Sequence, residues 1–171
     1  MTEPTRRLVL VRHAKAADAD RDINRPLSTR GLRDARELGR WLSARTITPD
    51  VALVSPARRA RETWDAISSR VGDVPVQVED AIYDNTVDAV LAVIRSAPSD
   101  AEVVAVVGHN PAISAVAHVL DDGGGDANAR ADLARGFSTN AVAVFAVAQS
   151  WADLKDGGAT LIAFATPRDA G

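Results

Sequence analysis

The sequence of 171 residues contains no cysteine, which excludes disulfide bonds, thiolate metal sites and cysteine nucleophiles. Aromatic residues make up only 4% of it, and no apolar run approaches the roughly 20 residues that span a bilayer. The net charge is −3 with no polybasic cluster, so neither nucleic acid nor a membrane surface is expected as a partner. The apolar run near the N-terminus is too short for a secretory signal, and we expect a cytoplasmic protein.

The remaining composition, 46% apolar and 25% charged, is typical of a globular protein, and the length favours a single domain over residues 1–171. Leu32, Ala35, Leu38 and Leu42 share one apolar stripe at helical spacing, which is expected to face the core, and such helical segments alternate with strand-like runs. This alternation predicts an α/β fold, a three-layer α/β/α sandwich with a mostly parallel sheet. A hairpin-like loop before the last strand predicts an antiparallel edge. The predicted strands are 7–12, 51–55, 74–79, 102–108, 141–147 and 159–165.

Three of the predicted strands end in polar residues. The first delivers Arg12-His13, the second runs into "SPARRARET" (55–63), and the fourth ends in "GHNP" (108–111). Ser55 is placed to cap the helix that follows it. Because the carboxyl ends of parallel strands share one edge, histidines and arginines are expected to converge there beside helix N-termini. Arginine forks match phosphoryl oxygens, and a histidine can attack phosphorus.

Arg12-His13-Ala14 resembles the Arg-His-Gly signature of the histidine phosphatase superfamily, whose fold is phosphoglycerate mutase-like. "SPARRARET" is similar to its Ser-x-x-x-Arg-Ala-x-x-Thr segment, with Arg59 in the arginine position and Thr63 at the end, and "GHNP" is similar to its Gly-His segment. The chain most resembles the compact SixA-type phosphohistidine phosphatases, also in "RPLSTRG" (25–31) and "FSTNAVAVF" (137–145). The resemblance runs from about residue 7 to 147.

The resemblance implies a role for each matched residue. His13 would be the nucleophile and carry the phosphoryl group as a transient phosphohistidine, while Arg12, Arg59 and His109 would hold the phosphate. Asn110 is a further phosphate-binding candidate. No metal or other cofactor is implied. Two neighbouring guanidinium groups disfavour protonation of an imidazole, so we predict that His13 is neutral at pH 7.

The chain departs from the family pattern at Ala14, where relatives have glycine, and at Lys15, where many have an acid. Members that hydrolyse phosphate esters use a carboxylic acid after the third strand to protonate the leaving oxygen. "VEDAIYDNT" offers Glu79, Asp80 and Asp84, of which Asp84 is the predicted donor. SixA-type enzymes can lack this acid, because a protonated imidazole leaves phosphorus more readily than an alkoxide does.

Three functions follow from these observations. The first is removal of phosphoryl groups from phosphohistidine in a protein. The second is hydrolysis of a small phosphorylated metabolite with Asp84 or a neighbour as the acid. The third, from another class, is a phosphate-binding module that has lost catalysis. A lone Arg-His at a strand end is more often an ordinary solvated terminus, and the joint occurrence of three motifs in order favours an enzyme.

Several other features are predicted to carry no chemistry. The segment "DADRD" (18–22) fails as a calcium loop, since Ile23 and Thr29 occupy positions that need glycine and glutamate. It is interpreted as a mobile acidic rim that shapes which substrates enter. His118 falls off the apolar face of its helix and is expected at the surface. The glycine run 123–125 within the glycine-rich segment 121–128 is predicted to be a flexible loop, and residues 166–171 a frayed tail.

Overall fold

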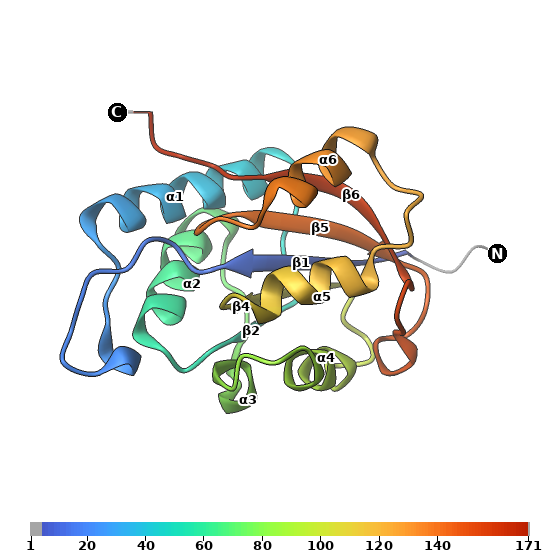
Figure 1. Cartoon of the computed structure of the whole chain (residues 1–171), viewed down its shortest axis with the longest axis horizontal. Helices are drawn as coiled ribbons and strands as arrows, with labels where there is room; N and C mark the ends of the chain where they lie inside the picture. Colours follow the sequence, from blue (N-terminus) through green and yellow to red (C-terminus); the bar gives the residue numbers. More distant parts are fainter. Residues whose placement is uncertain (1–4, 171) are drawn as a thin grey trace.

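The computed structural model describes residues 5–170, in which one twisted sheet lies between helices (Figure 1). The strands are β1 (Arg6–Arg12), β2 (Val51–Val54), β3 (Val76–Val78), β4 (Val103–Gly108), β5 (Val142–Val147) and β6 (Ala159–Ala165). The helices are α1 (Thr29–Ala44), α2 (Arg58–Val71), α3 (Asp80–Tyr83), α4 (Val87–Arg95), α5 (Ala112–Leu120) and α6 (Ala127–Arg135). Two short 3-10 segments are η1 (Asp22–Asn24) and η2 (Trp151–Asp153).

The strand order is β3-β2-β4-β1-β5-β6. The first four strands in this order are parallel, whereas β5 runs antiparallel to β1 and β6 antiparallel to β5. The predicted mostly parallel α/β sheet with an antiparallel edge pairing is therefore confirmed. The predicted strand 74–79 is reduced to the three exposed residues of β3 at the opposite edge.

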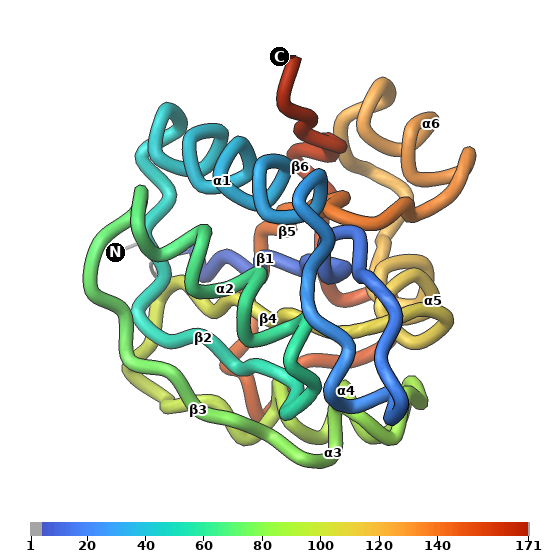
Figure 2. The backbone as a smooth tube through the Cα atoms, turned by 90° about the vertical axis from the view of Figure 1, so that its left-hand side faces the viewer, coloured from blue at the N-terminus to red at the C-terminus, as the bar shows by residue number. Residues whose placement is uncertain are grey.

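Side chains of the central strands alternate between two cores, as buried strands require. Leu8 and Leu10 of β1 pack in one core with apolar residues of α4, α5 and α6. Val9 and Val11 pack in the other core with residues of α1 and α2. Figure 2 shows the two sets of helices on opposite sides of the strands. The expected three layers are therefore present.

Helix α1 begins where Ser28 accepts a hydrogen bond from the Gly31 N–H at 3.0 Å, an N-cap of the usual kind. A Cβ at Gly31 would fall on the carbonyl oxygen of Lys15, so this glycine allows α1 to pack against the turn that follows β1. In this helix Asp34, not Leu32, faces inward. The expectation that Leu32 belongs to the buried stripe is wrong, since it is 37% exposed.

The C-terminal segment is bound to the molecule, so the prediction of a frayed tail is wrong for its described part; Gly171 lies outside the described residues. Arg168 forms an ion pair with Asp34 at 3.2 Å, and the Asp169 N–H donates to the same carboxylate at 2.9 Å. The Asn140 side chain donates to the Pro167 carbonyl at 2.9 Å. Asp34 is only 1% exposed, and burial of a carboxylate requires such partners.

The glycine-rich segment leads into α6 and is partly held by the sheet. The Asp126 N–H donates to the carbonyl of Leu161 in β6 at 2.9 Å, and the Asp126 side chain caps α6 through the Ala129 N–H. His118 is exposed on α5, as predicted. Within residues 5–170, no helix is both long and apolar enough to cross a membrane.

Candidate active site

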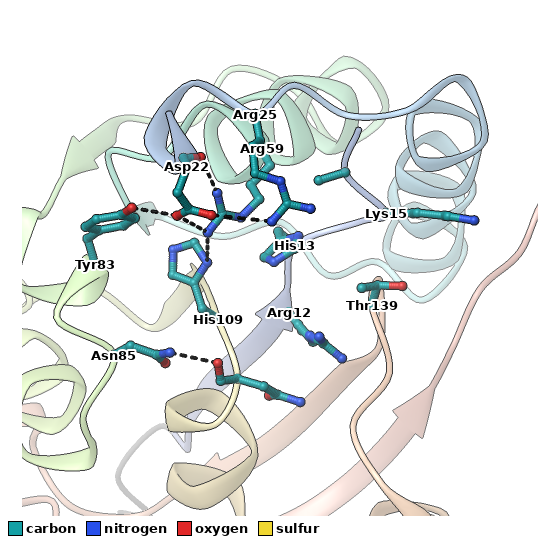
Figure 3. Close-up of a pocket in the computed structure, with 12 residues that line it drawn as sticks. Arg12, His13, Lys15, Asp22, Arg25, Arg59, Tyr83, Asn85, His109 and Thr139 are labelled. Atoms are coloured by element: carbon teal, nitrogen blue, oxygen red, sulfur yellow. Dashed lines mark hydrogen bonds and ion pairs between the residues drawn. The ribbon is translucent and has the colours of Figure 1, made fainter. Parts of the chain in front are cut away.

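A pocket of about 540 Å³ opens where the parallel strands end (Figure 3). Arg12 pairs with Gly108 and Val54 with Val107, so the ends of β1, β4 and β2 are level. The residues after each end therefore face one crevice, as an open α/β sheet predicts. The pocket is lined by Arg12, His13, Lys15, Ala16, Asp22, Arg25, Arg59, Tyr83, Asn85, His109, Asn110 and Thr139.

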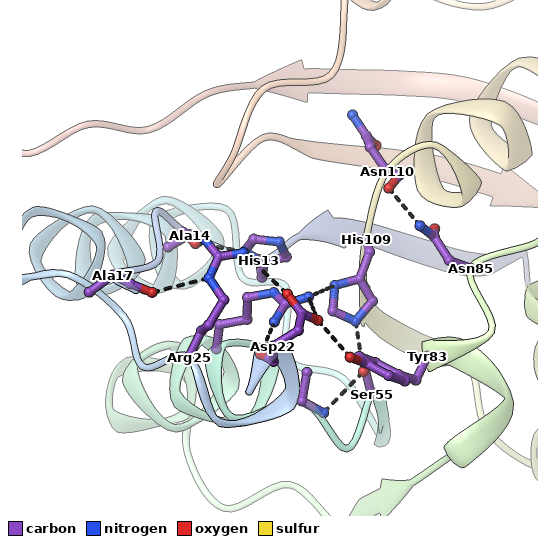
Figure 4. A network of polar contacts seen from close by, with 12 residues as sticks. His13, Ala14, Ala17, Asp22, Arg25, Ser55, Tyr83, Asn85, His109 and Asn110 are labelled. Carbon is purple, nitrogen blue, oxygen red and sulfur yellow. Dashed lines mark hydrogen bonds and ion pairs between the residues drawn. The ribbon is translucent and has the colours of Figure 1, made fainter. Parts of the chain in front are cut away.

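His13 follows β1 and is 8% exposed. Its Nδ1 lies 2.7 Å from the carbonyl oxygen of Ala14, which can only accept, so Nδ1 carries the proton (Figure 4). The lone pair of the neutral ring is therefore on Nε2. Nε2 is the atom that can attack an electrophile in the pocket.

Burial lowers the pKa of His13 from 6.5 to about 4, and the positive charges of Arg59, Arg12 and Arg25 act in the same direction. The hydrogen bond to Ala14 opposes these effects only in part. His13 is thus neutral at pH 7. The sequence-based argument named the guanidinium groups as the cause, whereas desolvation is the larger one.

His109 follows β4, and its ring centroid lies 5.2 Å from that of His13. Its Nδ1 accepts from Arg59 at 3.4 Å, so Nε2 carries the proton and donates to Ser55 Oγ at 2.7 Å. Burial is the main reason that the pKa of His109 falls to about 3. Ser55 does not cap α2, contrary to the prediction, because the helix begins only at Arg58 with Ala57 at its N-cap. The serine hydroxyl orients the histidine instead.

Arg12 and Arg59 both have a buried Nε with no hydrogen-bond partner. Buried polar atoms are almost always paired, so two unpaired guanidinium N–H groups in one pocket mark a place for an anion. Burial also lowers the pKa of Arg12 below its usual value. Arg12, His13, Arg59 and His109 form the predicted cluster, which we call the floor of the pocket.

Thr63 connects the two halves of the floor. Its Oγ1 accepts from the Ala14 N–H at 3.0 Å and donates to the Arg59 carbonyl at 2.7 Å. Ala14 is fully buried, so the methyl group at the family's glycine position is accommodated. The turn after His13 and the helix that carries Arg59 are thus held in one arrangement.

Asp22, Arg25 and Tyr83 form the opposite side of the pocket, which we call the rim. Arg59 donates to the backbone carbonyl of Asp22 at 2.8 Å and to its carboxylate at 3.1 Å. The Tyr83 hydroxyl donates to the same carboxylate at 2.6 Å, and Arg25 lies 3.4 Å from its second oxygen. Asp22 was considered in the sequence only as part of the acidic rim, and these bonds hold the segment in place.

The rim carboxylate is ionised. The hydrogen bond from Tyr83 is the largest cause that lowers the pKa of Asp22 to about 2, and contacts with Arg59 and Arg25 add to it. The same bond raises the pKa of Tyr83, so the phenol keeps its proton. The Asp22 side chain is 52% exposed and accessible from the pocket mouth.

None of the carboxylates considered as proton donors lines the pocket. Asp84 is exposed at the end of α3, Asp80 is exposed at its start, and Glu79 is half-buried before it. The short helix turns Tyr83 and not Asp84 into the pocket, because Ile82 is fully buried and fixes its rotation. The structure thus brings together the floor residues but leaves Asp84 outside.

Asn110 lies in the pocket with its side chain donating to the Phe137 carbonyl at 2.8 Å, as does Arg12 at 3.1 Å. Its own carbonyl accepts from Asn85 at 2.7 Å. Asn85 and Thr139 also line the pocket and were not singled out in the sequence. Arg25 could have been found from "RPLSTRG", whereas Asp22 was noted only within the acidic segment 18–22, with no signal that places its side chain in the pocket. Within the described part of the chain, no group of three acidic or histidine side chains could hold a metal ion.

Comparisons with known proteins agree with this geometry. Residues 8–86 match the model of the histidine phosphatase superfamily, branch 1. An uncharacterized protein of Mycobacterium tuberculosis strain H37Rv is 37% identical over 161 residues, which are 92% of this chain and all of that protein.

The similarity extends to solved structures. A provisionally assigned phosphohistidine phosphatase SixA from Nakamurella multipartitia is 36% identical, with a TM-score of 0.87 over 98% of this chain and 99% of that one. A second provisional SixA, from Agrobacterium tumefaciens, is 30% identical with a TM-score of 0.79 over 97% and 100%. A phosphoglycerate mutase from Plasmodium falciparum shares the fold, so the predicted phosphoglycerate mutase-like architecture is confirmed.

Proposed function

Because the chain belongs to the histidine phosphatase superfamily and is SixA-like within it, we propose that it is a protein phosphohistidine phosphatase that works through a phosphohistidine on His13. The observation that carries the proposal is the state of His13. Its ring is buried and neutral, with the proton on Nδ1 and the lone pair on Nε2 beside two guanidinium groups that lack partners for Nε.

In the first step, Nε2 of His13 attacks phosphorus while the bond from phosphorus to the substrate's imidazole nitrogen breaks. The bonding electron pair goes to that nitrogen, and an imidazole protonated at its other nitrogen departs as a neutral ring. Arg12 and Arg59 offset the charge on the phosphoryl oxygens in the transition state. Water then attacks phosphorus, the bond from phosphorus to Nε2 breaks, and Nε2 regains its lone pair. The product leaves as dihydrogen phosphate, which carries the oxygen and both protons of the water.

The Ala14 carbonyl supports both steps. It holds the proton on Nδ1 before the attack and stabilises the positive ring that exists while Nε2 carries the phosphoryl group. When water releases phosphate, His13 returns to the same neutral tautomer without exchanging a proton.

The ester-hydrolysing alternative needs a group that protonates an alkoxide. The predicted donors Glu79, Asp80 and Asp84 lie outside the pocket lining, and the carboxylate that does line it, Asp22, is ionised. This arrangement favours a substrate whose leaving group needs no proton from the enzyme. It argues against a small-metabolite ester as the main substrate.

The test compares hydrolysis of a phosphohistidine-carrying protein with a panel of phosphate monoesters, without added metal. Wild type is expected to prefer phosphohistidine, and His13→Ala is expected to lose at least about a thousandfold in turnover while it still binds inorganic phosphate. His118→Ala, a change to an exposed histidine, serves as the control. Faster turnover of an ester would support the metabolite phosphatase, and absence of turnover on every substrate would support a binding module.

A further inference from the structure

The rim of the pocket contains a charge that the proposed phosphoryl transfer does not use. Among the described residues that line the pocket, four are cationic and Asp22 is the only carboxylate. An anion beside a phosphate site is unfavourable for binding a phosphoryl group, since like charges repel. The rest of the substrate is where a carboxylate would have a favourable partner.

Building on the proposed function, we propose that Asp22 recognises the leaving group: its carboxylate accepts a hydrogen bond from the protonated second nitrogen of the substrate's phosphorylated imidazole and so selects nitrogen–phosphorus over oxygen–phosphorus bonds. Asp22 is half-exposed at the mouth of the pocket, while Arg59 and Tyr83 bind its Oδ2. Its other oxygen has only the 3.4 Å contact with Arg25, which leaves acceptor capacity toward a ligand.

This assignment gives each of the two imidazoles in the reaction a hydrogen-bond acceptor for the N–H opposite its phosphorylated nitrogen. On the enzyme side, the Ala14 carbonyl accepts a hydrogen bond from Nδ1–H of His13 while Nε2 carries the phosphoryl group. On the substrate side, Asp22 accepts a hydrogen bond from the ring nitrogen that is not bonded to phosphorus. A negative partner stabilises the protonated form of the ring, the form that departs as neutral imidazole when the phosphorus–nitrogen bond breaks.

The same carboxylate disfavours esters. A departing alkoxide or phenolate gains negative charge in the transition state, and Asp22 would repel it while offering no proton. Arg59, Arg25 and Tyr83 hold the carboxylate where it is, so it does not withdraw from the ligand. Asp22 therefore favours the phosphohistidine and disfavours the ester. A group that only positions Arg59 would affect both substrates equally.

The experiment measures kcat/KM for a phosphohistidine peptide and for p-nitrophenyl phosphate in wild type, Asp22→Asn and Asp20→Asn. Asp22→Asn keeps the size of the side chain and removes its charge. It is expected to lose on the order of tenfold or more on the phosphohistidine peptide and to keep or gain activity on the aryl ester. Asp20→Asn removes the same charge from an exposed position in the same segment and is expected to match wild type on both substrates.

Two further readouts separate recognition from positioning. The alkaline decline of kcat on phosphohistidine should move to lower pH in Asp22→Asn, because the ring of the bound substrate loses its proton more easily without the carboxylate. Tyr83→Phe removes a hydrogen bond to Asp22 but leaves its charge, so it should retain the preference for phosphohistidine.

Equal losses on both substrates in Asp22→Asn, with an unmoved pH profile, would overturn the assignment to the leaving group and leave Asp22 as a support for Arg59. A wild-type protein that hydrolyses esters but not phosphohistidine would instead overturn the proposed function itself, and this inference with it. The wild-type measurement thus distinguishes the two failures.

Discussion

The floor and the rim of the pocket are built differently. The floor residues His13, Arg59 and His109 are each less than a tenth exposed and follow directly from strands or lie in the first turn of a helix. The rim residues come from the segment after β1 and from the four-residue helix α3, and the side chain of Asp22 is half-exposed. The floor is thus set by the sheet, which the whole fold stabilises, while the rim is set by local contacts. This separation allows one phosphoryl chemistry to be combined with different selections of substrate.

The largest expected effect concerns a floor residue that also binds the rim. Arg59→Met should lower kcat/KM by about a thousandfold, because it removes a buried positive charge and its unpaired Nε–H donor from the phosphate site and releases Asp22. Steady-state kinetics on the preferred substrate would check this. Arg61→Met, on the exposed face of the same helix, should stay close to wild type. A loss of similar size in Arg61→Met would show that activity depends on the total positive charge of α2 and not on the position of the Arg59 guanidinium in the pocket.

The second effect concerns protonation of the floor. The pKa of His13 falls from 6.5 to about 4 on folding, so the unfolded state binds a proton first, and stability that is complete above pH 6.5 is lost as pH falls toward 4. The difference in unfolding free energy between wild type and His13→Gln should change by about 3 kcal/mol over this interval.

Chemical denaturation at pH 7 and pH 4 would measure this change, since glutamine has no titrating group. A ring titration of His13 by NMR should give the same low value. An unchanged difference between the two variants, or a titration near 6.5, would contradict the buried neutral state.

The smallest expected effect on activity concerns the C-terminal segment, which contacts Asp34 and Asn140 outside the pocket. Removal of residues 167–171 takes two partners from the buried carboxylate of Asp34 and one from Asn140, and should reduce the unfolding free energy by about 1–3 kcal/mol. Activity at 25 °C should change less than twofold, because Asn140 keeps its backbone bonds to the carbonyls of Arg12 and His13. Thermal unfolding and kinetics on the same preparation would check both. A large loss of activity with unchanged stability would mean that the tail acts on the site directly.

The comparison of floor and rim also explains how far the sequence could predict the site. Two buried strands end in Arg12-His13 and Gly108-His109. Because the carboxyl ends of parallel strands share an edge, these sequences predict that the two histidines lie close together. The position of Asp22 depends on a fold of the segment between β1 and α1 that no periodicity encodes. Asp84 was chosen among Glu79, Asp80 and Asp84 by its register with the family pattern. The burial of Ile82 decides which side of α3 faces the pocket, and that side carries Tyr83.

The same limits apply to the fold. The three layers and the mostly parallel direction of the strands follow from apolar patterns. The inward position of Asp34, in contrast, depends on partners 134 and 135 residues away in sequence. A helical pattern assigns such a polar residue to the surface. By the same helical pattern Leu32 was expected to be buried, whereas α1 buries Gly31, Asp34 and Ala35 and leaves Leu32 exposed.

The segment between β1 and α1, which carries Asp22 and Arg25, is closed by contacts between its two ends. Ala16 and Leu27 form an isolated antiparallel bridge, the Ala17 N–H donates to the Pro26 carbonyl at 2.8 Å, and the Leu27 N–H is held by Glu62 of α2. The two ends of the segment are therefore fixed to each other and to the scaffold independently of what lies between them. In engineering terms, residues 18–25 form an exchangeable cassette. A loop of another length or charge grafted between these anchors would redirect the enzyme to new phosphorylated compounds, provided that the graft supplies Arg59 with the two acceptors that Asp22 offers.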